Sequence, residues 1–227
     1  MKKILTIFLL VMTIVSVGYS QSGCDRSYIR SKIQDYGECK NVAITKNNGD
    51  LMLYGDNGYA TTACCPSDLQ NALKELNNNQ KTINDIVLTE NGKWLVLYGA
   101  NGFKGNGTPD EMWDKIIGDF SDEDILSVTF NDNGDWIIIT TEYYSTSDQW
   151  IADWLKDGEK SLGELWAACL TDDAMVAVYA DGFKVYGNVP EKLKKALRDT
   201  DLNVFRLKLA GSAWFFADKN GSYQYDM

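Results

Sequence analysis

The chain repeats itself about every 40 residues. One apolar segment of each copy marks the period most clearly, and these segments begin at Leu51, Trp94, Trp136, Met175 and Trp214. Each copy reads as three short strands followed by one helix. A repeat of this length is typical of a supersecondary unit that is stacked in a row or arranged in a ring, because one such unit cannot bury its apolar face alone. The period therefore constrains the architecture more than any other feature of the sequence.

Tight turns are predicted inside the copies. In the first two copies, Asn-Gly dipeptides separate the apolar segments at residues 48–49, 57–58, 91–92 and 101–102. An Asn-Gly pair between apolar runs is the strongest short-range signal for a β-hairpin, because both residues of a type I′ turn take positive φ. We therefore expect a meander of three antiparallel strands in each copy, with type I′ turns at these dipeptides.

The middle strand of each copy is apolar at nearly every position, as in the Trp-Ile-Ile-Ile run at residues 136–139. A strand that lacks polar alternation is predicted to be buried on both of its faces. The tryptophans Trp94, Trp136 and Trp214 stand at the starts of three such strands. We therefore expect these three side chains in the core.

A helix is predicted after each of the first four meanders. These helices open at Pro66, Pro109, Ser147 and Pro190. Proline suits the first helical position because its missing N–H would be unpaired there, and the acids that follow favour the positive end of the helix dipole. Apolar residues then recur at helical spacing, so in the third of these helices we expect Trp150 and Trp154 on the buried stripe.

The two ends of the repeat array complement each other. Residues 26–37 carry apolar side chains at helical spacing before any strand, while the last copy stops at Met227 without a helix. The predicted fold class is therefore α+β, with five βββα repeats of about 40 residues closed into a propeller-like ring whose N-terminal helix completes the last repeat. An open array is the alternative, but it would need polar caps, and residues 214–216 (Trp-Phe-Phe) would make a poor outer surface.

The domain organisation follows from the repeat. We expect a signal peptide over residues 1–20 and a single five-repeat domain over residues 21–227. The predicted repeat cores span about 41–76, 84–120, 125–158, 165–199 and 203–227, together with the helix at 26–37.

This repeat count and topology resemble a five-bladed β-propeller. Permuted by one element, the unit is also similar to that of the penteins, or α/β-propellers. Catalytic penteins that act on guanidino groups use a cysteine with a histidine and carboxylates, and this chain contains no histidine. The resemblance therefore implies the fold of a non-catalytic pentein and does not bring the catalytic activity with it.

The N-terminus predicts export. Lys2 and Lys3 precede an apolar run over residues 4–17, and Gly18-Tyr19-Ser20 offers the small residues that a signal peptidase reads. The run is short for a membrane span, although a retained anchor is the alternative. We expect a secreted, periplasmic or cell-surface protein. A lipoprotein is a further alternative, in which the protein would meet the membrane through a lipid on Cys24.

Five cysteines follow the predicted signal, at Cys24, Cys39, Cys64, Cys65 and Cys169. Export permits disulfides. Cys39 just precedes one strand and Cys64 ends another in the same repeat, so Cys39 paired with Cys64 or Cys65 is the preferred bridge. The alternative is that all of them are reduced, because sequence alone does not fix connectivity. No cysteine spacing matches a zinc site, and we predict no metal and no cofactor.

The acidic surface excludes some partners. The formal net charge is −10, and removal of residues 1–20, with two lysines and no acid, would bring it to −12. Such a surface repels the phosphates of nucleic acid and anionic lipid, so neither is an expected partner. Without histidine, the usual serine or cysteine nucleophile with an imidazole base is excluded as well. Catalysis would need a lysine base or a pair of carboxylates.

Aromatic residues supply the binding hypothesis. Tyr54, Tyr98 and Tyr179 take the same place in three copies, at the end of the second strand, and Tyr186 is one of several more near the third strand. A rim of such side chains could stack on a sugar or hold a peptide; the alternative is that they seal sheets to helices. We predict a monomeric, non-catalytic binding protein for a glycan, peptide or cell-envelope partner. The alternative function is a carboxylate-dependent hydrolase, such as a glycosidase, acting in the central opening.

Overall fold

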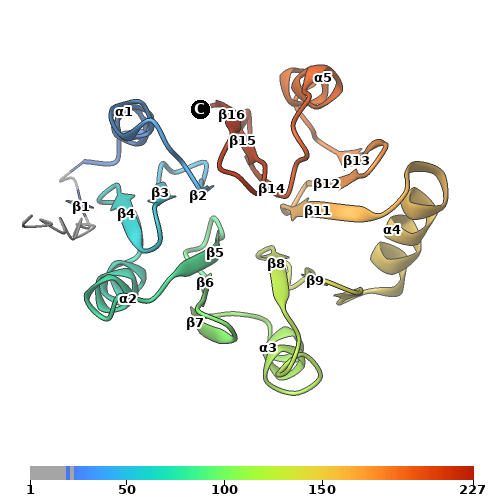
Figure 1. The fold of residues 1–227 in the computed structure, drawn as a ribbon, viewed down its shortest axis with the longest axis horizontal. Coiled ribbons are helices and arrows are strands. Elements are labelled where there is room, and N and C mark those ends of the chain that lie inside the picture. The colour runs from blue at the N-terminus through green and yellow to red at the C-terminus, as the bar shows by residue number, and fades with distance from the viewer. Residues whose placement is uncertain (1–18, 21–22) are drawn as a thin grey trace, which may run out of the picture.

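The computed structural model describes residues 19–20 and 23–227. Within this part the chain forms five three-stranded antiparallel meanders and five helices, so the α+β class and the βββα repeat are confirmed (Figure 1). The meanders are β2 (Asn41–Ala43), β3 (Leu51–Tyr54) and β4 (Gly58–Thr61); β5 (Ile83–Leu88), β6 (Trp94–Tyr98) and β7 (Gly102–Asn106); β8 (Ile125–Phe130), β9 (Trp136–Thr140) and β10 (Tyr144–Thr146); β11 (Leu165–Leu170), β12 (Ala174–Tyr179) and β13 (Gly182–Gly187); and β14 (Arg206–Ala210), β15 (Ala213–Ala217) and β16 (Tyr223–Asp226). The helices are α1 (Arg26–Tyr36), α2 (Ser67–Asn78), α3 (Asp110–Ile117), α4 (Gln149–Leu162) and α5 (Glu191–Asp199).

The helices begin slightly later than predicted. Pro66, Pro109 and Pro190 are the N-cap residues of α2, α3 and α5, one position before the first helical residue. Their backbones are extended, with ψ between 131° and 136°, and a proline ring offers no acceptor for the free N–H groups of the first turn. Helix α4 differs, because the Asp148 carboxylate caps it by accepting a hydrogen bond from the Trp150 N–H at 2.6 Å.

The hairpins form where predicted, but their turns are not type I′. Among the described residues, Asn48 and Gln80 are the non-glycine residues with positive φ, so no Asn-Gly pair has the two positive φ angles that the turn requires. In the second copy, Tyr98 pairs with Gly102 across a three-residue loop, and Gly99 takes the positive φ of 61°. The predicted turn type is therefore wrong.

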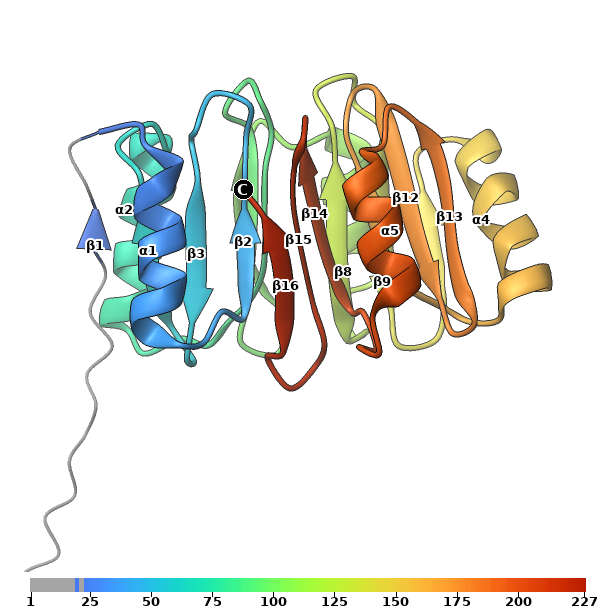
Figure 2. The same ribbon diagram turned by 90° about the horizontal axis from the view of Figure 1, so that it is seen from above.

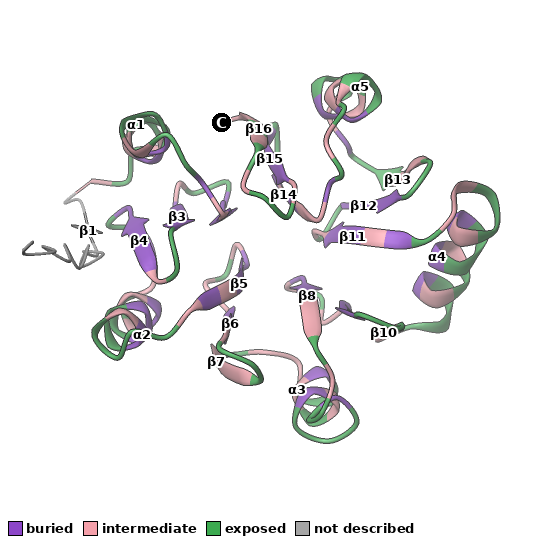
Figure 3. Ribbon diagram, in the orientation of Figure 1, coloured by how far each residue is buried: buried purple, intermediate pink, exposed green. Residues whose placement is uncertain are grey.

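The middle strands are buried on both faces, as predicted. In β9, Trp136 and Ile138 pack with α3 and the β5–β7 sheet, whereas Ile137 and Ile139 pack with α4 and the β11–β13 sheet. The described residues contain five such apolar clusters, each made by one helix and the sheets on its two sides. The burial of Trp136, and of Trp94 and Trp214 in their own strands, is also confirmed. Figure 3 shows the middle strands β3, β12 and β15 in the colour of buried residues.

The fifth cluster brings the two ends of the array together. Ile29 and Ile33 of α1 pack with Met52 of the first sheet and Phe215 of the last, and Arg30 Nη1 donates a hydrogen bond to the backbone oxygen of Met227 at 2.9 Å. The first strands of successive sheets contact one another, and β14 and β15 contact β2. Figure 1 shows these first strands toward the middle and the helices outside. The meanders remain separate sheets, because no strand pairing joins one to the next within the described residues.

A short strand, β1 (Tyr19–Ser20), adds to the first sheet by running parallel to β4. Figure 2 shows β1 at one end of the molecule. The remainder of the predicted signal peptide, residues 1–18, lies outside the described residues. Cleavage after Ser20 would remove β1 and leave the first sheet with three strands, like the other four. No helix in the described part of the chain has the length and apolar character needed to cross a membrane.

The disulfide pairing differs from the preferred one. Cys64 is bonded to Cys24, with their Cα atoms 5.2 Å apart, whereas Cys39 and Cys65 are buried free thiols. The predicted bridge from Cys39 is therefore wrong. Cys169 is also free and buried, as expected for a small apolar residue of β11.

The reason for this pairing lies in the entry to α1. The Gly23 carbonyl accepts a hydrogen bond from the Ala63 N–H at 3.1 Å, which places the segment before α1 against the end of β4. Cys24 and Cys64, next to these two residues in sequence, are thereby brought together. Because the Cys24 sulfur is used in the disulfide, it has no thiol to carry a lipid, and the structure gives the lipoprotein alternative no support.

Candidate functional site

A buried polar network joins the first strands where they converge. The side chain of Asp85 in β5 is 1% exposed. Its carboxylate accepts hydrogen bonds from Asn41 Nδ2 of β2 at 2.6 Å, Ser127 Oγ of β8 at 3.0 Å and Lys208 Nζ of β14 at 2.9 Å. One side chain thus links four of the five repeats.

Local backbone geometry explains how Asp85 reaches its partners. The pairing of β5 with β6 shifts register between Ile83 and Asp85, and the pairing of β8 with β9 shifts between Ile125 and Ser127. A bulge of this kind re-aims the side chain that follows it. Burial acts to raise the pKa of Asp85, but the charge of Lys208 and the hydrogen bonds outweigh it and hold the pKa below its usual value.

This network does not have the form of a hydrolytic site. A glycosidase needs two carboxyl groups that face the substrate, at about 5 to 10 Å from each other. Asp85 is shielded from solvent and paired with Lys208 at 2.9 Å. The arrangement supports a structural role, and the alternative of a hydrolase in the central opening gains no support from it.

Two of the predicted rim tyrosines cover glycines of the neighbouring strand. Tyr54 lies opposite Gly58 and Tyr98 lies opposite Gly102. A Cβ atom would sit 2.4 Å from the Tyr54 ring at Gly58 and 2.3 Å from the Tyr98 ring at Gly102. Each ring therefore packs directly on a glycine backbone, a contact that compensates for the missing side chain. Tyr54 also stacks on Tyr36 of α1, with ring centroids 4.3 Å apart.

The third predicted rim residue, Tyr179, lies inside the protein. Its side chain is 1% exposed, its ring packs on Gly158 of α4, and its hydroxyl donates to the Leu155 carbonyl at 3.2 Å. Burial raises its pKa. Tyr179 therefore offers no face to a ligand, and its position agrees with the alternative interpretation, in which these tyrosines seal sheets to helices.

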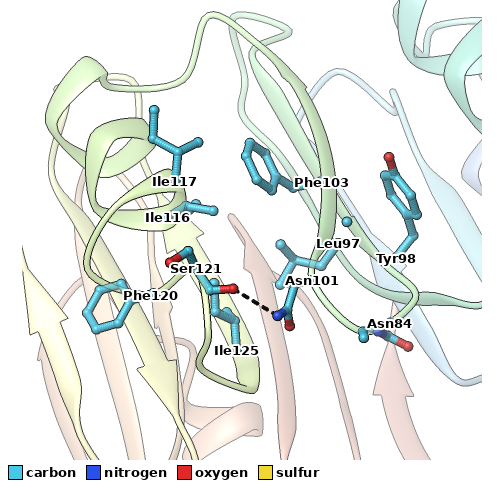
Figure 4. A pocket seen from close by; sticks show the side chains of 12 residues that line it. Asn84, Leu97, Tyr98, Asn101, Phe103, Ile116, Ile117, Phe120, Ser121 and Ile125 are labelled. Atoms are coloured by element: carbon cyan, nitrogen blue, oxygen red, sulfur yellow. Dashed lines mark hydrogen bonds between the residues drawn. The ribbon is translucent and has the colours of Figure 1, made fainter.

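Tyr98 borders a cavity of about 190 Å³ between β6, β7 and α3. Figure 4 shows Phe103 between the Tyr98 ring and Ile117, so the ring stands at the border of the cavity. Asn101 Nδ2 donates a hydrogen bond to the Ser121 carbonyl at 2.9 Å, which ties the two walls together. No charged residue of the described chain lines the cavity, so it offers no charge that would hold an ionic ligand.

A larger cleft of about 540 Å³ lies between the start of α4, β12, β13 and the loop that joins β8 to β9. Two of its lining residues are among the most exposed large apolar side chains of the described chain, Trp150 at 49% and Tyr186 at 55%. Their ring centroids are 4.9 Å apart with an interplanar angle of 66°. The rings therefore form a corner that presents aromatic surface to solvent.

The start of α4 places Trp150 in this cleft. The Asp148 cap makes Trp150 the second helical residue, and the buried face of α4 carries Ile151 and Leu155. Trp150 lies beside that stripe, so its predicted burial was wrong. Tyr186 comes from β13, where it pairs with Met175 of β12. In the sequence, Tyr186 was one of several aromatic residues near a predicted third strand, and no sequence pattern indicated that it contacts Trp150.

Carboxylates make up most of the polar lining of the cleft. They are Asp135, Asp148, Asp172 and Asp173, and among the described residues no lysine or arginine belongs to the lining. One oxygen of Asp172 accepts a hydrogen bond from the Asp132 N–H at 2.9 Å. Asp173 accepts one from Thr171 Oγ1 at 3.1 Å and lies 3.8 Å from Lys46 Nζ, with its own side chain 48% exposed. The site therefore combines an aromatic corner with an acidic wall.

These features define the protein as a repeat-built α+β domain with an exposed aromatic and acidic cleft. A scan against protein-family models finds no match, and a search of the curated proteins finds no similar sequence. The function is therefore argued from the site itself.

Proposed function

We propose that this protein is a secreted, non-catalytic binding protein that holds its ligand in the cleft beside Trp150 and Tyr186. The observation that carries the proposal is the aromatic corner, because two large rings that are half exposed and in contact with each other are costly to leave in water without a partner. The cleft volume of about 540 Å³ lies within the range of small-ligand sites. The predicted partners, a glycan, a peptide or a cell-envelope component, all present groups that such a corner can cover.

We further propose that the five repeats close into a propeller-like ring that acts as the rigid scaffold of this site. Support comes from the cluster that α1 makes with the first and last sheets, and from the contact of β14 with β2. The side chain of Asp85 adds to this support by linking four repeats. In a closed array, α4 and β13 are held from both sides, and the cleft between them is preorganised.

Secretion is proposed from two observations. The disulfide between Cys24 and Cys64 is of the kind that persists in oxidising compartments, and residues 1–20 carry the features of a signal peptide. The mass of the exported protein tests this part. A chain that begins at Gln21 and loses two hydrogens on oxidation is expected, and a chain that retains residues 1–20 would contradict it.

Binding is tested on the full exported chain with arrays of glycans and peptides. We expect Trp150→Ala and Tyr186→Ala each to weaken the affinity for the ligand that the parent binds by tenfold or more. Tyr143→Ala is the matched control, because Tyr143 is 45% exposed and does not line the cleft. The proposal fails if no glycan or peptide binds below millimolar concentration, or if the control variant loses binding as strongly as the two cleft variants. Gel filtration of the same samples tests the predicted monomer.

A further inference from the structure

We infer that the cleft selects a cationic ligand, namely a lysine or arginine side chain of an extracellular polypeptide. This inference rests on the proposed function, because it assigns the ligand class of the same cleft. The aromatic corner alone suits sugars and peptides equally. The charges around it distinguish them.

The first argument is the sign of the charge. Four aspartates line the cleft, and in the described part of the chain no basic residue of the lining balances them. The nearest ion pair, from Asp173 to Lys46, is long at 3.8 Å, and both side chains are about half exposed. The hydroxyls of a neutral sugar can donate hydrogen bonds to these carboxylates but feel no long-range attraction to their charge. A cation is attracted both by the cleft and by the acidic surface of the whole chain.

The second argument is the combination of the acids with Trp150. Tryptophan is the best of the aromatic side chains for holding an ammonium or guanidinium group over its face. The angle of 66° between the Trp150 and Tyr186 rings gives a cation two aromatic walls. The carboxylates of Asp172 and Asp173 then supply acceptors for its N–H groups.

The third argument is that hydrogen bonds to one oxygen of each carboxylate hold three of the four aspartates in place. The backbone N–H groups of Asp132 and Trp150 hold one oxygen each of Asp172 and Asp148. Asn131 Nδ2 holds one oxygen of Asp135 at 3.0 Å. For each of these three carboxylates, no hydrogen bond within the described residues is made by the second oxygen, so that oxygen can accept from a bound cation without breaking a protein contact.

The test uses the full exported chain and isothermal titration with capped hexapeptides of alternating glycine and lysine. Matched peptides with glutamine or glutamate in place of lysine, and a neutral N-acetylglucosamine tetramer, are titrated in parallel. The double variant Asp172→Asn with Asp173→Asn removes two charges while it keeps an amide oxygen at each position. Asp122→Asn with Asp124→Asn is the matched control, because it removes the same charge from an exposed loop outside the cleft. Circular dichroism confirms that each variant is folded.

We expect the lysine peptide to bind and the glutamine and glutamate peptides to bind more weakly. Loss of two partly exposed ion pairs predicts about tenfold weaker binding in the cleft double variant and less than about twofold change in the control. Raising the salt from about 30 mM to about 300 mM should weaken the parent and leave the cleft variant nearly unchanged.

Three results would contradict the inference, and only the last of them would also contradict the proposed function. If the neutral tetramer binds, and its binding is lost in Trp150→Ala but unchanged in the double variant Asp172→Asn with Asp173→Asn, the inference is wrong and the proposed function stands. If the glutamate peptide binds as well as the lysine peptide, the inference is likewise wrong. If no probe binds, and Trp150→Ala changes nothing in the arrays, both are wrong.

Discussion

The polar network around Asp85 gives the sharpest prediction about stability. Asp85 accepts hydrogen bonds on Oδ1 from Asn41 Nδ2, Lys208 Nζ and its neighbour's backbone, the Ile86 N–H, at 2.6 to 2.9 Å. On Oδ2 it accepts from Ser127 Oγ and the Val128 N–H at 3.0 and 3.1 Å. The substitution Asp85→Ala would leave all of these donors without their acceptor. It would also leave the Lys208 ammonium without the acid that neutralises it.

The expected magnitude follows from burial. The side chains of Asp85 and Lys208 are 1% and 12% exposed, so water can solvate little of the charge that remains when one partner is removed. Removal of one partner from a buried ion pair costs about 3 to 5 kcal/mol, because the other charge stays buried and uncompensated. We therefore expect Asp85→Ala to lower the free energy of unfolding by about 4 kcal/mol. Lys208→Met should cost about 3 kcal/mol, because it leaves the Asp85 carboxylate buried without its cation and also removes the hydrogen bond from Lys208 to the Ile86 carbonyl at 2.7 Å.

The double variant separates pairing from packing. If Asp85 and Lys208 are coupled as described, Asp85→Ala combined with Lys208→Met should cost at least about 2 kcal/mol less than the sum of the two single changes. The assay is urea unfolding at pH 7 with the disulfide intact, followed by fluorescence of the buried tryptophans. A loss below about 1 kcal/mol in Asp85→Ala, or strict additivity in the double variant, would refute the reasoning.

Three further predictions concern acid, the disulfide and one glycine. The pKa of Asp85 in the folded protein lies below its unfolded value of about 3.9, so the stability that its carboxylate contributes is complete above about pH 4 and is lost as the pH falls through the folded pKa. The difference in unfolding free energy between the parent and Asp85→Asn should therefore shrink as the pH is lowered. A difference that does not depend on pH would contradict this. Replacing both Cys24 and Cys64 by serine opens a link across 40 residues of sequence, so urea unfolding should show a loss of about 2 to 4 kcal/mol, and no loss would argue against the bridge. Gly158→Ala would place a Cβ atom 2.1 Å from the Tyr179 hydroxyl, so we expect a loss of about 1 to 3 kcal/mol in spite of the better helix propensity of alanine, with Gly23→Ala, which meets no atom within 4 Å, as the neutral control.

The architecture was largely predictable because it depends on short-range patterns. Apolar runs such as 136–139 predict strands that are buried on both faces, and the helix at Arg26–Tyr36 follows from its periodicity. Helix starts were predicted to within two residues, since Pro66 and its equivalents belong to the N-cap and a sequence pattern does not separate this position from the next. Turn type was not predictable, because the loop after Tyr98 has three residues and the positive φ falls on Gly99.

The candidate site was harder to predict, because it depends on contacts between distant segments. The spacing of Tyr54, Tyr98 and Tyr179 was visible in the sequence, but their cover of glycines in other strands and in α4 was not. Trp150 and Tyr186 come from α4 and β13, and no local pattern indicates that their rings meet. The same limit applies to Cys24 and Cys64, because their pairing depends on where the segment before α1 meets β4.

The packing of α1 against the last sheet sets the order in which folding can be completed. Ile29 and Ile33 are synthesised well before Phe215, which lies far along the sequence from them. The cluster thus depends on a contact across nearly the whole sequence, such as the one from Arg30 to Met227, and contacts of such long range slow folding. A chain rearranged to begin at Asn41 and to carry α1 after Met227 would make every one of its helices local to a preceding meander. Such a permuted chain should reach the same structure sooner. In the natural order α5 covers one face of the last sheet, whereas the other face stays uncovered until α1 packs on it.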